Sequence, residues 1–160
     1  MHTFDIPDGF HDFLTTAKKS TYAGSDDETT LPDPLLNQSM QLEYREGDWF
    51  YRDIYYGTSF FSGMEVIYLL GKPLWSMTYS GGVDLGVDAQ KTRQLYNFLR
   101  SALSDLPIKF PVRGPTNFSD KMYDYKMRSN GNLIGFSGYE TIQRGDTELY
   151  SLTFSGGMLR

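Results

Sequence analysis

The chain has no cysteine among its 160 residues and only two histidines, His2 and His11. The missing cysteines exclude disulfides, thiolate metal sites and cysteine nucleophiles, and two histidines do not suffice for a zinc site, so we expect no metal. No apolar run approaches the roughly 20 residues that span a bilayer, and the N-terminus lacks the basic and apolar regions of a secretory signal. We therefore expect a cytoplasmic protein that does not bind membranes.

Positive charge is also scarce, because 15 Lys and Arg stand against 20 Asp and Glu, a net charge of −5. Affinity for nucleic acid depends on cations that neutralise phosphates, so we expect no direct nucleic-acid binding. The sequence contains neither a phosphate-binding glycine loop nor a Gly-x-Ser-x-Gly motif. We expect no cofactor. Whether any reaction is catalysed stays open, and we favour a protein that is not an enzyme.

Hydrophobic periodicity predicts two amphipathic helices. In the first, Phe10, Phe13, Leu14 and Ala17 recur at helical spacing, and in the second a similar stripe runs from an Asp88 cap to just before Pro107. Residues 20–40, which include the acidic run 26–28, read as a surface loop without calcium-loop spacing. Both helices are predicted to cover a sheet with their apolar faces.

Alternating apolar and polar residues predict the strands of this sheet. The predicted strands are 42–45, 49–56, 64–70, 74–79, 122–128, 134–143 and 148–154. Residues 64–70 are apolar at nearly every position, which indicates a central strand covered on both faces. Gly81 and Gly82 are expected to end the fourth strand, and residues 129–131 and 144–146 to form turns.

An internal repeat is the strongest pattern in the sequence. Residues 61–83 align without gaps to 136–158, with 11 identities in 23 positions, and the two helical stripes align at an offset of 85. We therefore predict one α+β domain over residues 1–160, built from two units, 8–83 and 88–158. Two helices should pack on an antiparallel sheet of six or seven strands with pseudo-two-fold symmetry.

Glu65 and Glu140 occupy the same position in the two repeats, two residues after a glycine. One interpretation is a functional pair of carboxylates, for acid–base chemistry or for holding a cation among aromatic rings. The alternative is that each glutamate accepts hydrogen bonds within its own unit and was copied by duplication.

The other candidate ligand-binding residues are mainly aromatic and lie in the first repeat. They are Trp49, Tyr51, Tyr55, Trp75 and Tyr79, together with Arg113. The rings could line a pocket for a flat or cationic molecule, or could be ordinary sheet packing. Arg113 lies in a rigid proline-flanked loop that could orient its guanidinium, or it is a surface arginine. For Arg52 and Asp53 the alternatives are a cross-strand ion pair and an anion-binding arginine.

Several linked motifs resemble an uncharacterised bacterial family of domains of unknown function. The motifs are Glu43-Tyr44-Arg45-Glu46-Gly47-Asp48, Tyr51-x-Asp53-x-Tyr55-x-Gly57, Phe61-x-Gly63-x-Glu65, Gly71-Lys72-Pro73-x-Trp75-x-Met77-x-Tyr79 and Arg113-Gly114-Pro115. The resemblance implies no particular activity. Some similar modules follow a helix-turn-helix DNA-binding domain, and this arrangement would imply ligand sensing. The sequence predicts no further helix before Phe10, so we do not expect this chain to bind DNA in that way. A looser likeness is to duplicated effector-binding domains, which hold cationic or hydrophobic ligands between helices and sheet.

From these patterns we expect a small-molecule-binding or sensory module with an aromatic pocket. The alternative is an interaction module that forms a homodimer or binds a protein partner through exposed aromatic residues such as Tyr55 and Tyr56. A third alternative is a carboxylate-pair hydrolase, which requires Glu65 and Glu140 to face one cleft.

Overall fold

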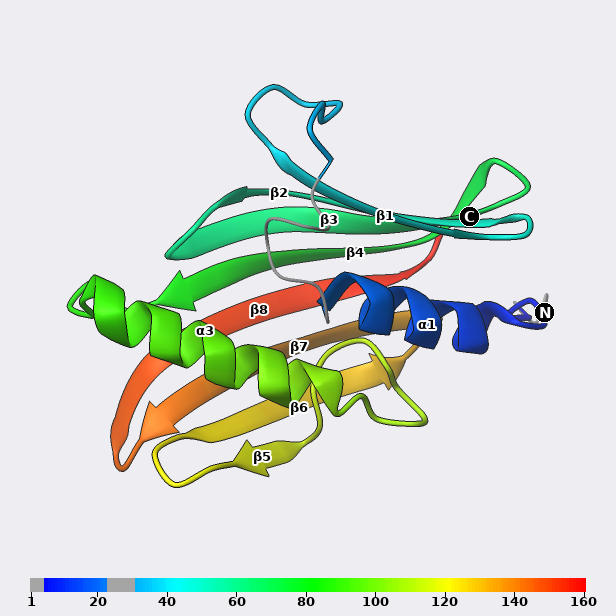
Figure 1. Ribbon diagram of the computed structural model, residues 1–160. Coiled ribbons are helices and arrows are strands. Elements are labelled where there is room, and N and C mark those ends of the chain that lie inside the picture. Colours follow the sequence, from blue (N-terminus) through cyan, green and yellow to red (C-terminus); the bar gives the residue numbers. More distant parts are fainter. Residues whose placement is uncertain (1–4, 23–30) are drawn as a thin grey trace.

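In the computed structural model, which describes residues 5–22 and 31–160, two helices lie on one face of an eight-stranded antiparallel sheet (Figure 1). The helices are α1 (Phe10–Tyr22) and α3 (Ala89–Ser104). The strands are β1 (Met40–Glu46), β2 (Trp49–Gly57), β3 (Phe60–Leu69), β4 (Lys72–Val83), β5 (Asn117–Ser119), β6 (Asp124–Asn132), β7 (Gly135–Arg144) and β8 (Thr147–Met158). The predicted α+β class is confirmed. The predicted six or seven strands are wrong, because β5 is too short to show alternation.

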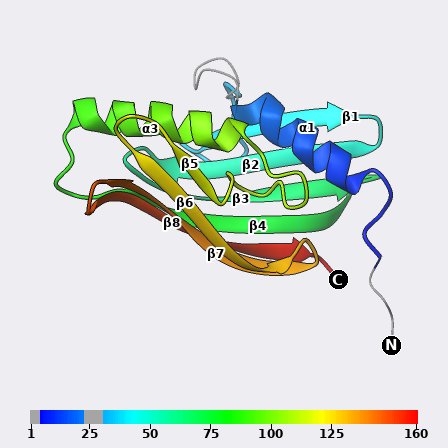
Figure 2. The same ribbon diagram turned by 90° about the horizontal axis from the view of Figure 1, so that it is seen from below.

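The strand order is β1-β2-β3-β4-β8-β7-β6-β5, so the last strands of the two halves pair at the centre of the sheet. Their register runs from Trp75 opposite Met158 to Val83 opposite Tyr150. The prediction that residues 64–70 form a central strand with two covered faces is wrong. β3 lies beside the central pair, and Met64 on its outer face is exposed, because both helices cover the opposite face (Figure 2).

The two helices pack through the stripes that the sequence predicts. Phe10, Leu14 and Ala17 of α1 are fully buried, as are Leu95 and Ala102 of α3. The predicted cap of the second helix is confirmed, because the Lys91 N–H donates to Asp88 Oδ1 at 2.8 Å. Helix α3 also contacts the edge of the sheet formed by β5. The ring centroid of Phe98 lies 5.6 Å from that of Phe118 in β5 and 5.4 Å from that of Tyr123.

Two glycine-containing predictions are wrong. Gly81 and Gly82 do not end a strand, since β4 continues to Val83. The turn predicted at 129–131 lies instead at residues 133–134, and Gly131 remains in β6 with φ +93°. A glycine is needed inside β4 because a Cβ on Gly81 would overlap backbone atoms of Ser151 and Leu152 in β8.

Replacing Gly81 with alanine is therefore expected to lower the free energy of unfolding by about 1–3 kcal/mol, because the added methyl group forces the central strands apart. Chemical denaturation monitored by tryptophan fluorescence measures the loss. Gly86→Ala is the matched control, since nothing lies within 4 Å of a Cβ at that position. Equal stability of the two variants would contradict the close approach of β4 and β8.

His2 and the acidic run 26–28 lie outside the described residues, as does part of the predicted loop 20–40. Residues 31–39 form neither helix nor strand. Across the described ranges, both helices are too short and too polar to cross a lipid bilayer.

Candidate functional site

A cavity of about 450 Å³ lies between the helices and strands β1 to β4. Its walls are mostly apolar or aromatic. The Tyr96 hydroxyl donates to the Ser59 carbonyl at 2.7 Å and so ties α3 to the β2–β3 turn beside the cavity. The lining side chains that the argument below uses are Asp53, Tyr55, Phe61, Glu65, Tyr79 and Tyr96, with Arg93, Arg100 and Arg113. This volume is large enough for a small organic molecule.

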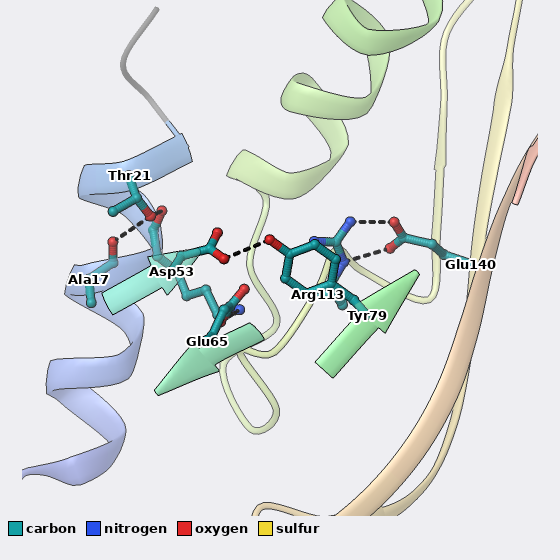
Figure 3. A network of polar contacts seen from close by, with 8 residues as sticks. Ala17, Thr21, Asp53, Glu65, Tyr79, Arg113 and Glu140 are labelled. Carbon is teal, nitrogen blue, oxygen red and sulfur yellow. Dashed lines mark hydrogen bonds and ion pairs between the residues drawn. The ribbon is translucent and has the colours of Figure 1, made fainter. Parts of the chain in front are cut away.

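Two carboxyl side chains lie next to each other in the floor of the cavity. Asp53 of β2 is the register partner of Glu65 of β3, and strand alternation places both on the helix-covered face. Asp53 is 3% exposed and Glu65 is fully buried. The Tyr79 hydroxyl donates to Asp53 Oδ1 at 2.6 Å (Figure 3). Within the described chain, Tyr79 is the hydrogen-bond partner of the Asp53 side chain.

Glu65 has a different partner, because the fully buried ammonium of Lys18 forms an ion pair with it. Lys18 comes from the last part of α1, where Thr21 donates back to the Ala17 carbonyl at 2.9 Å. Helix α1 thus supplies a cation to one of the two neighbouring carboxyl groups. A buried charge is tolerated when such a partner compensates it.

The third buried carboxyl group, Glu140 of β7, has the densest set of partners. Arg113 Nε donates to Glu140 Oε2 at 3.0 Å, and its Nη2 donates to Oε1 (Figure 3). The hydroxyls of Tyr125 and Tyr150 donate to the same carboxylate at 2.6 Å and 2.9 Å. Burial and the nearby Glu140 charge raise the pKa of both tyrosines, so both remain donors. The buried Glu140 carboxylate thus accepts four hydrogen bonds in this network, which satisfies its charge and its lone pairs.

Asp53 differs from the other buried acids in its protonation. Burial raises its pKa to about 7, and the neighbouring Glu65 charge adds to the effect, while the Tyr79 hydrogen bond, Lys18 and Arg113 oppose it. Burial lowers the pKa of Lys18, against the opposing effect of Glu65. Burial also raises the pKa of Tyr96 to about 12. Asp53 therefore exchanges a proton near neutral pH.

Asp53→Asn is expected to remove a pH dependence of stability. The native pKa of Asp53 lies above the unfolded value, so the native state binds the extra proton, and wild-type stability falls as the pH rises from about 4 through about 7. Asparagine carries no charge at any pH. The free energy of unfolding of the variant should equal that of the wild type near pH 5 and should exceed it by about 1–3 kcal/mol near pH 8.

Urea denaturation at several pH values measures this difference. Asp146→Asn, in an exposed turn, is the matched control and should follow the wild-type profile. If Asp53→Asn and the wild type show parallel profiles across the window, the raised pKa is wrong.

The structure brings together only some of the predicted ligand-binding residues. Tyr55, Glu65, Tyr79 and Arg113 line the cavity. Tyr51 and Trp75 are fully buried in the core instead, beneath the helices. Strand alternation points both side chains toward the helices, where they pack in the core and do not line a pocket.

Two further predicted residues lie apart from the cavity. Trp49 packs on α1, with its ring centroid 6.1 Å from Phe10 and 5.3 Å from Phe13. Glu140 is held by Arg113 and is not among the residues that line the cavity. The carboxyl pair that opens into the cavity is thus Asp53 with Glu65. Arg52, by contrast, makes the predicted cross-strand ion pair, with Glu43 at 2.9 Å on the uncovered face.

Asp53 and Lys18 are the important residues that sequence reasoning missed. A signal for each was present, because Asp53 alternates with the inward-facing Tyr51 and Tyr55, and Lys18 follows Phe10 and Leu14 at four-residue intervals. A lysine near the end of a helix also fits a favourable interaction with the helix dipole, and an acid beside Arg52 also fits a cross-strand ion pair, so neither pattern alone identifies a buried charge. Among the described residues, no group of three His, Cys, Asp or Glu side chains is arranged to hold a metal ion.

The fold and cavity together define an α+β domain with an open antiparallel sheet, two covering helices and a carboxyl-containing pocket between the layers. Residues 53–159 match the family described as Domain of unknown function (DUF5680), and the chain belongs to this family. The match covers β3 to β8 and α3 and begins at Asp53. No curated protein and no solved structure matches the chain.

Proposed function

We propose that this protein binds a small organic molecule in the cavity between the helices and the first half of the sheet. The observation that carries the proposal is the combination of a volume of about 450 Å³ with aromatic walls and two carboxyl groups in the floor. Binding sites for small molecules are typically concave and apolar, with a few polar groups that fix orientation. A sensory role would use the same site.

The cavity walls are suited to flat or branched apolar groups. The Phe61 ring lies 6.0 Å from Tyr79, 6.0 Å from Tyr96 and 6.4 Å from Tyr55. These four rings come from β2, β3, β4 and α3, so a ligand among them would contact elements distant in sequence. Such a ligand would stabilise the packing of α3 on the sheet, which gives binding a thermal signature.

A thermal-shift screen of aromatic, aliphatic and cationic metabolites tests the proposal, with mass spectrometry of the native protein to detect a co-purified ligand. At least one compound should raise the melting temperature by about 2 °C or more. Thr92→Trp should abolish the shift by filling the cavity from α3. Ser101→Trp, on an exposed position of the same helix, should retain it. A broad library without a hit would overturn the proposal.

We also propose that the two halves arose by duplication and are related by a pseudo-two-fold axis at the β4–β8 pair. Each half is a helix followed by four antiparallel strands, and the strand order reverses at the centre. Glu65 and Glu140 lie on the third strand of each half, and each follows a glycine by two residues. Superposition of an experimental structure of one half on the other tests the proposal.

A second candidate function is homodimerisation through the sheet face that the helices leave uncovered. Large apolar side chains are exposed there on both sides of the central pair, among them Met64 of β3 and Tyr139 of β7, with Tyr56 near the end of β2. Light scattering over a range of concentrations tests this candidate. A stable dimer that Met64→Lys dissociates would support it, and a monomer at all concentrations would exclude it.

A further inference from the structure

We infer that the ligand is an organic cation, an ammonium group on an apolar body, and that its charged group pairs with Asp53 in place of a proton. This inference rests on the proposed function and names the ligand class for the same cavity. It is carried by the balance of buried charges, by the aromatic walls and by a difference between the two halves of the sheet.

The buried charges of the described chain do not balance. Three carboxyl groups, Asp53, Glu65 and Glu140, are buried with only two basic side chains, Lys18 and Arg113. Lys18 forms an ion pair with Glu65, and Arg113 forms one with Glu140. Asp53 is left with the neutral Tyr79 hydroxyl as its partner. The site is thus one positive charge short when all three acids are ionised, and a buried uncompensated charge is costly.

A proton supplies that charge in the empty protein, and a cationic ligand can supply it when bound. The rings of Tyr55, Phe61, Tyr79 and Tyr96 surround the same space. Aromatic faces attract ammonium groups and at the same time accept apolar groups. A carboxylate in the floor below aromatic walls therefore favours an ammonium over a neutral or anionic group of equal size.

The other charged groups around Asp53 do not remove this preference. Lys18 of α1 is paired with Glu65 of β3, and Arg113, in the loop before β5, is paired with Glu140. Arg93 and Arg100 of α3 also line the cavity, but Arg93 is exposed and Arg100 is half-buried. Arg93 and the solvent-facing part of Arg100 are screened by water and salt far more than a buried charge is, so Asp53 remains the buried acid of the described residues whose partner is a neutral hydroxyl.

The two halves of the sheet differ at the position of Asp53. Glu65 lies opposite Asp53 across β2 and β3, whereas Glu140 lies opposite Met127 across β6 and β7. The partner of Asp53 differs likewise: Tyr79 lies opposite Gly63, and Phe154 lies opposite Gly138. The second half therefore forms the same type of sheet with apolar residues at both positions. An acid at this position is thus not a general requirement of such a half-sheet, which favours a role for Asp53 in binding.

Isothermal titration calorimetry with three probes of nearly equal shape tests the inference on the full chain. The probes are 2-phenylethylammonium, 2-phenylethanol and phenylacetate, titrated near pH 5.5 and near pH 8. Near pH 8 the ammonium should bind at least about tenfold more tightly than either other probe. Competition with the Asp53 proton should weaken its binding about thirtyfold near pH 5.5, with about one proton released per ligand at that pH.

Variants identify the group responsible. Asp53→Asn should weaken ammonium binding at least about tenfold near pH 8 and abolish the pH dependence, whereas binding of 2-phenylethanol should not weaken. Asp146→Asn should behave as the wild type. Circular dichroism confirms that Asp53→Asn is folded.

The outcomes separate this inference from the proposed function. If 2-phenylethanol binds as tightly as the ammonium, or if Asp53→Asn binds the ammonium unchanged, the cavity binds small molecules but not by this charge, and the inference is wrong. If no probe binds at millimolar concentration, the inference is also wrong, while the proposed function is decided by the broad thermal-shift screen.

Discussion

Arg113→Met is expected to lower the free energy of unfolding by about 3–5 kcal/mol, because the variant leaves the Glu140 carboxylate buried without its cation. Arg113 makes two hydrogen bonds to Glu140, and both side chains are buried. The hydroxyls of Tyr125 and Tyr150 would remain, but neutral donors do not compensate a full charge. Chemical denaturation monitored by tryptophan fluorescence measures the loss.

The double variant Arg113→Met, Glu140→Gln should recover a large part of this loss, because it removes both charges together. Arg52→Met is the matched control. Arg52 also pairs with a glutamate, Glu43, but the pair is partly exposed on the uncovered face, so about 1 kcal/mol or less should be lost. A small effect for both arginine variants would show that the buried network contributes little to stability.

Lys18→Met is expected to destabilise the protein by about 3 kcal/mol or more near pH 8 and by much less near pH 5. The change leaves Asp53 and Glu65 facing each other without the cation of α1. The Lys18 charge opposes the rise of the Asp53 pKa, so its removal raises that pKa further. The native variant then binds more protons than its unfolded state, and its stability falls as the pH rises.

Denaturation at several pH values measures this effect. Lys19→Met is the control, because Lys19 is the exposed neighbour on the same helix and its loss should cost about 0.5 kcal/mol or less. Adding Glu65→Gln to Lys18→Met should restore stability near pH 8. A pH-independent loss for Lys18→Met would indicate lost packing of the aliphatic stem instead of lost charge.

The sequence contained enough information for most of the fold. Helical spacing located both helices, because a one-sided apolar stripe such as Phe10, Phe13, Leu14 is specific to a helix on a core. Alternation located the long strands for the same reason. It did not predict the extent of β4, since a double glycine normally ends a strand, and the close approach of β8 that makes Gly81 necessary is a contact between distant segments.

The candidate site was predicted less completely. Glu65, Tyr55, Tyr79 and Arg113 were recognised as candidates, and all four line the cavity. Lys18 was missed because a lysine in the last turns of a helix is ordinarily solvated, and only the position of α1 over the sheet reveals its partner, Glu65 of β3. The register between β2 and β3 likewise determines that Asp53 and Glu65 are neighbours. Alternation within a single strand does not reveal how that strand is aligned with the next one.

The central position of β4 and β8 has a consequence for the order in which the protein can assemble. These strands pair residues 75–83 with 150–158, so the contact that joins the halves closes a loop of about half the chain. Such long-range closure slows folding. During synthesis the inner edge of β4 therefore stays unpaired until β8 has emerged from the ribosome. An unpaired edge is a template for association with other chains, so the nascent protein is most vulnerable to aggregation while β4 is exposed and β8 has not yet paired with it.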